Sequence, residues 1–478
     1  MREARPNVPT SYLELNAESR PEAPAVFDAD LTLTFAQLRE RVHASASALK
    51  ERGVGAGDVV AVSLANVWEY VTLELAVPLL GAVLLPLPLT LGEAERRRAL
   101  ALTRAAVVVD DGEAARLCSA PFRGPVQPPP PDPARVVEIA LTSGSTGPPK
   151  LASLHAGLKQ ATFEAFTSRL EVTPEDRVLV MSPLTQGIGG MCLYCLRLGA
   201  ALVMLRERRF SAEHALRTAA HSRATLLVGV PTNVIRMLDS PSLPGTDLSA
   251  ARCTAVAGAP MAPEVARAWE TGTGSRVCVF YGSMDAGQLS VGSPSDPGEK
   301  RWTTVGRPHD CAEVKVTAEG EICMRAPTVQ QRYWGEARGP YSEDGWVHMG
   351  DLGFVDDEGY LHVTGRIKDL VIRGGANINP HEVEAVLRSH PDVADICVVG
   401  RPDREFGERA MAFVVARRPL TVDDLRRHLE AQGLARYKWP EFLELVDEIP
   451  LAGPGKADRR LLAERAAASS PVLPAPRK

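Results

Sequence analysis

The sequence predicts an α/β protein with a largely parallel, buried sheet, followed by a smaller α+β domain. Short apolar segments recur at intervals that leave room for one helix between them, a pattern typical of parallel strands covered by helices on both faces. From Leu361 onward, strands and helices follow in mixed order over roughly 110 residues, a usual size for one domain. The 478 residues are enough for two to four domains of ~100–200 residues each.

The clearest predicted helix runs from Thr34 to Arg52. Thr34 and Gln37 have the spacing of a capping box, apolar side chains recur every three or four residues, and Gly53 follows the last turn. The strands predicted around it in the large domain are Val59–Leu64, Val107–Val109, Val136–Leu141, Val178–Met181, Ala201–Leu205, Leu226–Val230, Thr254–Ala257 and Val277–Phe280.

The C-terminal segment has a different order of elements. Its predicted helices are Pro380–Arg388 and Val422–Gln432. Its predicted strands are Leu361–Thr364, Leu370–Ile372, Ile396–Val399 and Ala412–Val415.

Composition and charge exclude several classes of function. The net charge of −5 gives no excess of positive charge for nucleic acid or an anionic membrane. The uncharged run Leu75–Gly92 contains three prolines, so it predicts a buried helix end, a turn and a strand instead of a membrane span. Eight cysteines without regular spacing indicate reduced thiols, as in a cytoplasmic protein. Oligomeric state is not predicted.

A polar, glycine-rich segment follows the predicted strand Val136–Leu141 directly. It runs Thr142-Ser143-Gly144-Ser145-Thr146-Gly147-Pro148-Pro149-Lys150. Glycines let backbone N–H groups approach an anion, hydroxyl groups add hydrogen-bond donors, and the lysine adds a positive charge. The segment therefore predicts a phosphate-binding loop. It is not a Walker loop, because Pro149 stands where that motif has the glycine before its lysine.

This segment closely resembles the signature loop of the adenylate-forming (AMP-binding) superfamily, which includes acyl-CoA and aryl-CoA synthetases, aryl acid–AMP ligases and firefly luciferase. Further motifs occur in the family's order, so that the resemblance covers roughly residues 10–465. It implies that Thr142 is a catalytic residue. It also implies that the ATP phosphates are bound by Ser143, Gly144, Ser145, Thr146, Gly147 and Lys150.

The segment Phe280-Tyr281-Gly282-Ser283-Met284-Asp285 resembles the family's aromatic–Gly–x–Thr–Glu motif. The resemblance implies that Tyr281, Gly282 and Ser283 contact the nucleotide and that Asp285 binds Mg²⁺. Aspartate is one methylene shorter than glutamate but remains a hard oxygen ligand. Met284 replaces the family's threonine and cannot donate a hydrogen bond, so it becomes a candidate for the substrate pocket.

Two later segments resemble the family's ribose-binding and hinge motifs. Trp346-Val347-His348-Met349-Gly350-Asp351 resembles the Gly–Trp…Thr–Gly–Asp segment, with Met349 at the threonine. This implies that Asp351 accepts hydrogen bonds from the ribose hydroxyls. Gly365-Arg366-Ile367-Lys368-Asp369 resembles the domain junction, which implies that Arg366 reaches the ribose and phosphate as a catalytic residue and that Lys368 is the hinge.

The two remaining C-terminal motifs concern the second half-reaction and the catalytic lysine. The pair Gly374–Gly375 matches the family's hairpin beside the thiol's entry tunnel, where missing side chains allow close approach. The segment from Pro450 to Arg459 resembles the catalytic-lysine loop. This implies that Lys456 bridges a carboxylate oxygen and the α-phosphate as charge develops there.

The acid pocket is the least specified part of the resemblance. Ala257-Gly258-Ala259-Pro260 resembles the Gly–Gly–Ala loop of the acyl and adenine pocket, which implies nucleotide contacts for Gly258 and Ala259. Thr185 and Gln186 stand where relatives often have an aromatic residue or histidine. The candidate acid-binding residues are Gln186, Gly187, Ile188, Ala257 and Met284. Glycines with Ile and Met indicate a compact, flat, largely apolar cavity.

The resemblance implies a large adenylation domain over residues 1–366 and a small mobile domain over residues 367–478, with the active site in the cleft between them. It implies an ATP-dependent, AMP-forming ligase that activates a small aromatic or cyclic carboxylic acid. Acyl-AMP forms with release of pyrophosphate, and the acyl group passes to CoA or to a carrier protein's thiol. ATP and Mg²⁺ are the expected cofactors, and CoA is a candidate co-substrate.

Two alternative functions stay open. Some proteins that resemble aryl-CoA ligases use ATP to activate nitrite and diazotise an aryl amine, and the departures at Thr185, Met284, Asp285 and Met349 are compatible with that role. The other alternative is an inactive homologue that serves as a binding protein. Lys456 and the intact glycine-rich loop argue against it.

Overall fold

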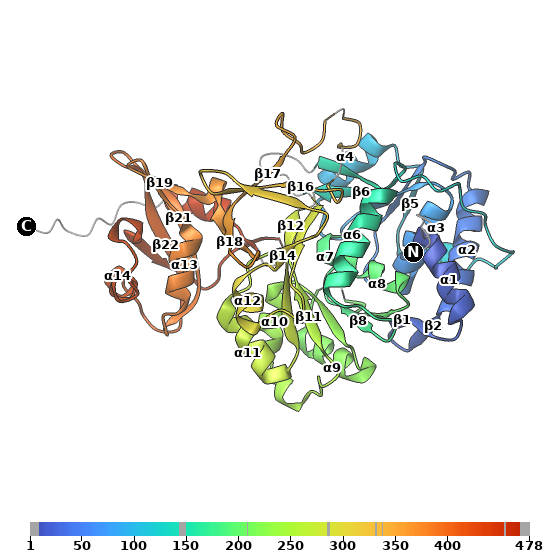
Figure 1. The fold of residues 1–478 in the computed structure, drawn as a ribbon, viewed down its shortest axis with the longest axis horizontal. Coiled ribbons are helices and arrows are strands. Elements are labelled where there is room, and N and C mark those ends of the chain that lie inside the picture. Colours follow the sequence, from blue (N-terminus) through green and yellow to red (C-terminus); the bar gives the residue numbers. More distant parts are fainter. Residues whose placement is uncertain are drawn as a thin grey trace, which may run out of the picture. The chain divides into compact units, whose positions relative to one another are not determined.

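The computed structural model describes residues 9–142, 150–207, 209–283, 287–329, 332–336, 338–453 and 456–468, with the backbone alone at 9, 10, 453 and 456. The chain divides into two compact units (Figure 1). The first unit comprises Met1–Lys315, Cys323–Met349 and Asp356–Leu361. The second unit comprises Val316–Ile322, Gly350–Val355 and His362–Lys478.

The larger sheet of the first unit has nine strands in the order β14-β13-β12-β11-β10-β8-β9-β1-β2. From β12 to β1 each strand runs parallel to its neighbour, and β13, β14 and β2 add antiparallel edges. The strands are β1 (Pro24–Asp28), β2 (Leu31–Thr34), β8 (Arg177–Val180), β9 (Ala201–Met204), β10 (Leu226–Gly229), β11 (Cys253–Val256), β12 (Arg276–Ser283), β13 (Gly287–Val291) and β14 (Arg307–Pro308).

The second sheet of this unit has five strands in the order β5-β3-β4-β6-β7. The first four strands are parallel, and β7 returns antiparallel to β6. The strands are β3 (Val59–Val62), β4 (Val83–Pro86), β5 (Val107–Val109), β6 (Val136–Thr142) and β7 (Lys150–His155). The predicted largely parallel α/β architecture is therefore present in both sheets.

Helices cover both faces of the nine-stranded sheet. Along β8, Val178 and Val180 belong to one hydrophobic cluster, whereas Leu179 belongs to another, because successive side chains of a strand point to opposite faces. Among the helices on this sheet, α10 contacts both α9 and α11, and the three helices lie in the lower part of Figure 1. The α-helices of the unit are α1 (Pro9–Ser19), α2 (Phe35–Glu51), α3 (Trp68–Leu79), α4 (Glu93–Thr103), α5 (Asp111–Cys118), α6 (Ala156–Arg169), α7 (Gly187–Met191), α8 (Leu193–Arg197), α9 (Ala212–Ser222), α10 (Pro231–Leu238), α11 (Pro263–Thr273) and α12 (Gly298–Thr303).

Two local predictions in this unit are confirmed. Thr34 caps α2 with a reciprocal capping box to Gln37, and Gly53 has a φ of +85° just past the helix end. The uncharged run Leu75–Gly92 contains the end of α3, a turn and the buried strand β4. In the described ranges, no helix combines the length and the apolar character that a membrane crossing needs.

The strands β15 (Glu313–Val316), β16 (Glu321–Arg325), β17 (Val347–Val355) and β18 (Leu361–Arg366) contribute residues to both units. The second unit also has a sheet in the order β20-β19-β22-β21, with β23 beside β22. Its strands are β19 (Val371–Arg373), β20 (Ala376–Ile378), β21 (Val393–Asp403), β22 (Gly407–Ala416) and β23 (Phe442–Leu445), with a separate pair β24 (Leu451–Gly453) and β25 (Lys456–Ala457). Its helical elements are α13 (Pro380–Arg388), α14 (Val422–Ala431), α15 (Arg459–Ala468) and the 3₁₀ turns η2 (Ile367–Asp369) and η3 (Arg436–Lys438).

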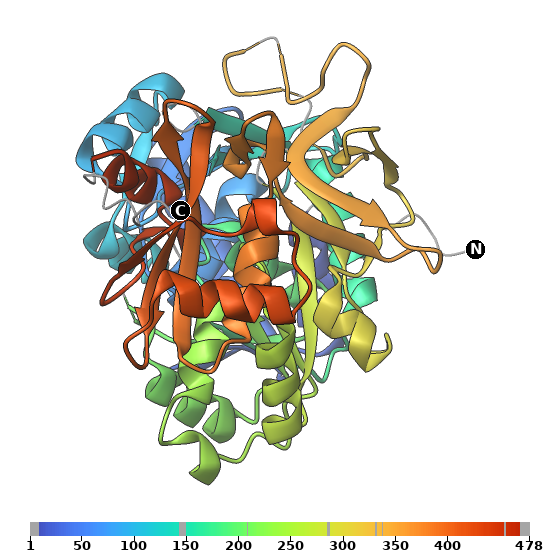
Figure 2. The same cartoon turned by 90° about the vertical axis from the view of Figure 1, so that its left-hand side faces the viewer.

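Helices also cover both faces of β21 in the second unit (Figure 2). Val398 packs in the same cluster as Leu387 of α13, whereas Cys397 packs with Leu462 of α15. The predicted helix Pro380–Arg388 is confirmed with the same bounds. The mixed α+β pattern expected for this end of the chain is therefore confirmed.

Candidate active site

Three of the predicted site segments lie at or after the carboxyl ends of parallel strands in the nine-stranded sheet. Gln186–Ile188 come after β8, Ala257–Ala259 after β11, and Tyr281–Ser283 form the end of β12. The register pairs Val180 with Val228 and Val256 with Val279, so these strands end at one edge of the sheet. In open α/β sheets, ligands bind outside the carboxyl ends of the strands. The fold therefore brings the predicted acid and nucleotide segments to one edge.

The segment after β8 turns sharply into the short helix α7. The Asn66 side chain holds this turn, donating to Ser182 O at 2.8 Å and accepting from Leu184 N–H at 2.8 Å. A Cβ at Gly189 would lie 2.1 Å from Pro183 O, so no side chain fits there. Ile188 is 6% exposed and packs in the hydrophobic core. Close packing thus fixes the backbone that presents Gln186.

The segment after β11 also depends on a glycine. Gly258 has a φ of +87°, a left-handed conformation that side chains disfavour. The N–H of Ala257 donates to Gly229 O at 3.2 Å, which ties the segment to the end of β10. The backbone after Val256 is thereby held open beside the sheet edge.

The segment after Phe280 continues into a hairpin. Tyr281 pairs with Ser290 and Gly282 with Gln288, and a Cβ at Gly282 would lie 2.4 Å from Gly287 O. The hairpin turn, with the predicted substrate residue Met284 and the predicted magnesium ligand Asp285, lies outside the described residues.

The predicted phosphate loop connects the hairpin strands β6 and β7. Thr142 pairs with Lys150 across the hairpin, and the intervening Ser143, Gly144, Ser145, Thr146 and Gly147 lie outside the described residues. Thr142 is 2% exposed, and its Oγ1 has no hydrogen-bond partner within the described ranges. The Nζ atom of Lys150 lies 4.4 Å from the centroid of the Tyr333 ring. The two ends of the predicted loop are therefore adjacent, one buried and one exposed.

A cavity of about 430 Å³, part of it open solvent, lies beside Gln186 and Gly187. We call it the polar cavity, because its lining includes Tyr70, Glu74, Glu138, Lys159, Thr185 and Gln186. Three of its lining side chains are charged, and leucines, tyrosines and glycines make up much of the rest. The compact, largely apolar acid pocket stays a prediction.

The charged groups of the polar cavity form one buried cluster. Lys159 Nζ lies 2.9 Å from Glu74 Oε1 and also donates to Glu138 Oε2, and the three side chains are 9–15% exposed. Burial raises the pKa of Glu74 to about 7, although Lys159 opposes the shift. Burial lowers the pKa of Lys159, but the two carboxylates outweigh it and leave this pKa above its usual value. The ammonium of Lys159 therefore stays charged at neutral pH.

This cluster was not predicted from the sequence, although the sequence contains a signal for it. Glu74 and Glu138 each stand alone in an apolar run, Val71–Leu79 and Val136–Leu141. Charged residues are rarely buried without a partner. A lone carboxylate in a core segment therefore predicts a buried cation elsewhere in the chain.

In the second unit, Asp351 and Arg366 form an ion pair. Arg366 Nε lies 2.9 Å from Asp351 Oδ1, and the carboxylate side chain is 7% exposed. Both residues were predicted to bind the ribose, and they come from β17 and from the end of β18. The structure brings these two residues together.

The predicted hinge and glycine hairpin follow directly. Lys368 is exposed and lies in the 3₁₀ turn η2. Gly374 and Gly375 have φ values of +56° and +84°, and they form the two-residue loop between β19 and β20. Two consecutive positive φ values are the requirement of a type I′ turn, which glycines satisfy without strain.

The predicted catalytic Lys456 is described by its backbone alone, which pairs with Gly453 across β24 and β25. The next helix, α15, is anchored by Arg459, which donates to both oxygens of Glu384 at 2.7 and 2.8 Å. The His381 ring also lies 3.4 Å from Glu384. Burial raises the pKa of Glu384, but His381 and Arg459 outweigh it and lower this pKa.

Two known domain families match this chain. Residues 13–334 match the AMP-binding enzyme family, and residues 382–456 match the AMP-binding enzyme C-terminal domain. The first match alone spans more than half of the chain. The chain belongs to the AMP-binding enzyme family.

Individual relatives in this family are similar over most of the chain. A feruloyl-CoA synthase of an Amycolatopsis species is 32% identical over 471 residues, covering 92% of this chain and 95% of that protein. YngI of Bacillus subtilis (strain 168), named as an acyl-CoA synthetase, is 32% identical over 356 residues. That match spans 69% of this chain and 63% of YngI.

A solved structure extends the similarity to the fold. The amide bond synthetase McbA from Marinactinospora thermotolerans superposes with a TM-score of 0.85 at 28% identity, covering 96% of this chain and 99% of that one. The predicted family and fold class are confirmed. As a member of this family of adenylate-forming enzymes, the chain is an ATP-dependent, AMP-forming ligase. The roles of individual residues stay predictions.

Proposed function

We propose that this AMP-binding enzyme adenylates a small aromatic or cyclic carboxylic acid and transfers the acyl group to the thiol of CoA. The observation that carries the proposal is the common position of Gln186, Gly258 and Tyr281 at the carboxyl edge of one parallel sheet. The similarity to a feruloyl-CoA synthase over 92% of the chain supports an aryl acid and CoA as substrates.

The reaction consists of two substitutions. A carboxylate oxygen attacks the α-phosphorus of ATP, a new P–O bond forms, and the bond to the β-phosphate breaks to release pyrophosphate. The thiol sulfur then attacks the carbonyl carbon, a C–S bond forms, and AMP leaves with the original carboxylate oxygen while the thiol proton goes to solvent. The enzyme's contribution is positioning and electrostatic stabilisation at phosphorus, so no side-chain nucleophile is needed.

In this proposal several segments of the chain contact the nucleotide. Thr142, the loop from Ser143 to Gly147, and Lys150 bind the phosphates, and Tyr281 stacks on the adenine. The Asp351 carboxylate accepts from the ribose hydroxyls while its partner Arg366 reaches toward the phosphate. The 2.9 Å pair between Arg366 and Asp351 supports these roles, because it holds both side chains in defined positions.

The acid and the thiol use other elements. Gln186, Gly187 and Ala257 border the acid, and Lys456 bridges the acid carboxylate and the α-phosphate. The Gly374–Gly375 turn lets the pantetheine thiol approach closely, because it has no side chains. The domains 1–366 and 367–478, with a hinge at Lys368, belong to the proposal, as does a magnesium ion on Asp285.

The test is AMP release from ATP with a panel of aryl and cyclic acids, each with CoA, with a carrier protein bearing pantetheine, or with no thiol. Acid-dependent AMP together with an acyl-CoA product is the expected result. If acylated carrier protein forms and acyl-CoA does not, the carrier protein is the acceptor in place of CoA. AMP release that requires nitrite and an aryl amine instead of an acid would reject the proposal in favour of diazotisation.

A further inference from the structure

We infer that the polar cavity binds the end of the acid remote from its carboxylate and selects acids that carry a hydroxyl or amino group there. The inference rests on the proposed function, since it names the class of acid. Its specificity-determining residues are Glu74, Glu138 and Lys159, none of which belongs to the motifs that identify the family in this chain.

The position of the cavity supports an acid-binding role. It is bordered by Gln186 and Gly187 at the carboxyl edge of the nine-stranded sheet. Side chains four apart on a strand share a face, so Glu138 and Thr142 lie on the same side of β6, about 13 Å apart along it. Thr142 is the predicted catalytic residue at the phosphate loop. Glu138, on the cavity wall, is thus separated along the strand from the predicted catalytic Thr142.

The hydrogen-bonding capacity of the cluster indicates a donor on the ligand. Each glutamate uses one oxygen to accept from Lys159, which leaves the second oxygen of each carboxylate as an acceptor within the described part of the chain. Lys159 is the partner of both, and its Nζ also lies 5.9 Å from the centroid of the Tyr194 ring. Two carboxyl groups around one ammonium therefore offer more oxygen atoms than Lys159 occupies.

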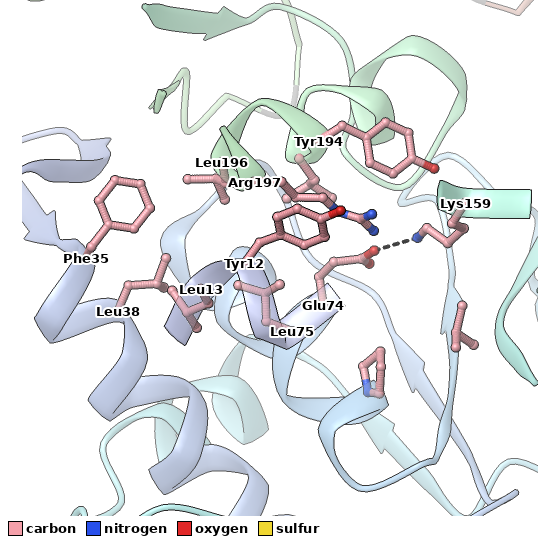
Figure 3. Close-up of a pocket in the computed structure, with 13 residues that line it drawn as sticks. Tyr12, Leu13, Phe35, Leu38, Glu74, Leu75, Lys159, Tyr194, Leu196 and Arg197 are labelled. Carbon is pink, nitrogen blue, oxygen red and sulfur yellow. Dashed lines mark hydrogen bonds and ion pairs between the residues drawn. The ribbon is translucent and has the colours of Figure 1, made fainter. Parts of the chain in front are cut away.

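A second cavity lies on the other side of this cluster and shares Glu74 and Lys159 with the first. It measures about 530 Å³, part of it open solvent, and apolar side chains such as Leu13, Phe35 and Leu38 line most of it. Figure 3 shows Glu74 pointing toward Lys159 at its edge, with Tyr12 and Arg197 beside them. Both cavities share Glu74 and Lys159, so this ion pair is a common wall.

The other cation near the wall has its own partners. Arg197 donates to Gln160 Oε1 at 3.2 Å, and its guanidinium lies 5.1 Å from the centroid of the Tyr194 ring. The spare carboxylate oxygens of Glu74 and Glu138 therefore remain for a ligand. A hydroxyl or amino hydrogen would satisfy them, whereas a methyl group would desolvate them without compensation, which is costly.

A purely structural role for the cluster makes a different prediction. In that case the pairs would join α3, β6 and α6, and their loss would lower stability without changing which acid is preferred. The ratio of kcat/KM between two acids separates the roles, because a general loss of folded enzyme cancels from the ratio.

The experiment uses benzoates in matched sets that carry a hydroxyl, an amino or a methyl group at each ring position, with AMP release as the readout. At one ring position, the kcat/KM of the wild-type enzyme is expected to be at least ~100-fold higher for the hydroxybenzoate or aminobenzoate than for the methylbenzoate. Sites that hydrogen-bond a polar group of the substrate reject analogues that lack this group. Glu138→Gln and Glu74→Gln are each expected to lower that ratio by ~10-fold or more. The matched control is Glu93→Gln on α4, an exposed residue, which should keep the wild-type ratio.

Two results would overturn the inference while leaving the proposed function standing. One is a wild-type enzyme that activates methyl-substituted, hydroxyl-substituted and amino-substituted benzoates equally well. The other is a donor preference that survives unchanged in both glutamine variants, with thermal unfolding confirming that they fold. Absence of AMP release with every acid would overturn the proposed function, and this inference with it.

Discussion

Arg366 Nε lies 2.9 Å from Asp351 Oδ1, although the two residues are separated by 15 positions in the sequence. The Asp351 carboxylate is 7% exposed, whereas the Arg366 side chain is 43% exposed. A fixed carboxylate beside a more accessible guanidinium is compatible with the proposed roles, in which Asp351 binds the ribose and Arg366 reaches the phosphate. In the proposed role, ATP would meet a preformed pair, so the carboxylate would need little reorganisation on binding.

Replacement of Asp351 should weaken ATP binding more than it slows the chemistry. Hydrogen bonds to a carboxylate contribute ~1.5–3 kcal/mol, and ribose contacts are equal in ground state and transition state. Asp351→Ala should therefore raise the KM for ATP by roughly 10–100-fold with a smaller change in kcat. Asp357→Ala, at an exposed turn position, is the control. A normal KM with a depressed kcat would contradict the ribose role.

Replacement of Lys456 should abolish adenylation and leave the fold intact. A charge contact that forms fully in the transition state is worth roughly 3–4 kcal/mol, or ~10²–10³ in rate. Single-turnover formation of acyl-AMP by Lys456→Ala measures this loss, and Lys50→Ala on α2 controls for removal of a surface charge. Unchanged acyl-AMP formation in the variant would remove Lys456 from the mechanism.

Restriction of Lys368 should affect the second half-reaction more than the first. Proline fixes φ near −65°, which lies within the 3₁₀ range of η2 but prevents rotation away from it. Lys368→Pro should therefore slow acyl transfer more than acyl-AMP formation. Lys368→Ala keeps the rotation and should resemble the wild type in both steps. Equal losses in both steps, or none, would argue against a hinge here.

The Glu384–Arg459 pair should stabilise the second unit in a pH-dependent way. Their side chains are 1% and 18% exposed, and removal of one partner from a buried pair costs about 3 kcal/mol or more. Glu384→Gln should therefore lower the unfolding temperature of the full chain, whereas Glu430→Gln, from the exposed pair with Arg436, should not.

The sign of this pH dependence follows from the lowered pKa of Glu384. Its stabilising contribution is present above the usual value of 4.5 and disappears as the pH falls through the folded-state pKa. Hydrogen bonds to Asp369 and Glu384 raise the pKa of His381 despite burial, so its stabilising contribution is present below about pH 6.5 and is lost as the pH rises through its folded-state pKa. Because Glu384 is one of these partners, the difference in stability between wild type and Glu384→Gln should be largest between about pH 4.5 and 6.5 and should shrink as the pH falls below 4.5. A difference that stays unchanged at lower pH would contradict the assignment.

Local sequence signals predicted much of the fold. The capping box at Thr34, the apolar strand runs and the helix Pro380–Arg388 depend on neighbouring residues, and the structure has them at nearly the same bounds. The strands β21 and β22 extend beyond the predicted Ile396–Val399 and Ala412–Val415. Their outer residues are more polar, and the pairing of β21 with β22 stabilises them, which periodicity within one strand does not reveal.

The same distinction applies to the candidate site, where local motifs predicted some parts and contacts between distant residues form others. Motifs with glycine, hydroxyl and charged residues at fixed spacing identified the sheet-edge segments and the pair Asp351–Arg366. The cluster of Glu74, Glu138 and Lys159 depends on contacts across 21 and 85 positions of sequence, so no local pattern encodes it. Only the unpaired carboxylate in each apolar run pointed to it.

Transfer of an oxygen atom from the acid to AMP tests the central claim most directly. The acid that gives the fastest AMP release is supplied with ¹⁸O in its carboxylate, together with ATP, CoA and the enzyme, and the products are analysed by mass spectrometry. Attack of the carboxylate on the α-phosphorus followed by thiolysis of the acyl-AMP predicts one ¹⁸O atom in each AMP and none in the pyrophosphate. Unlabelled AMP, or release of ADP and labelled phosphate, would contradict the account.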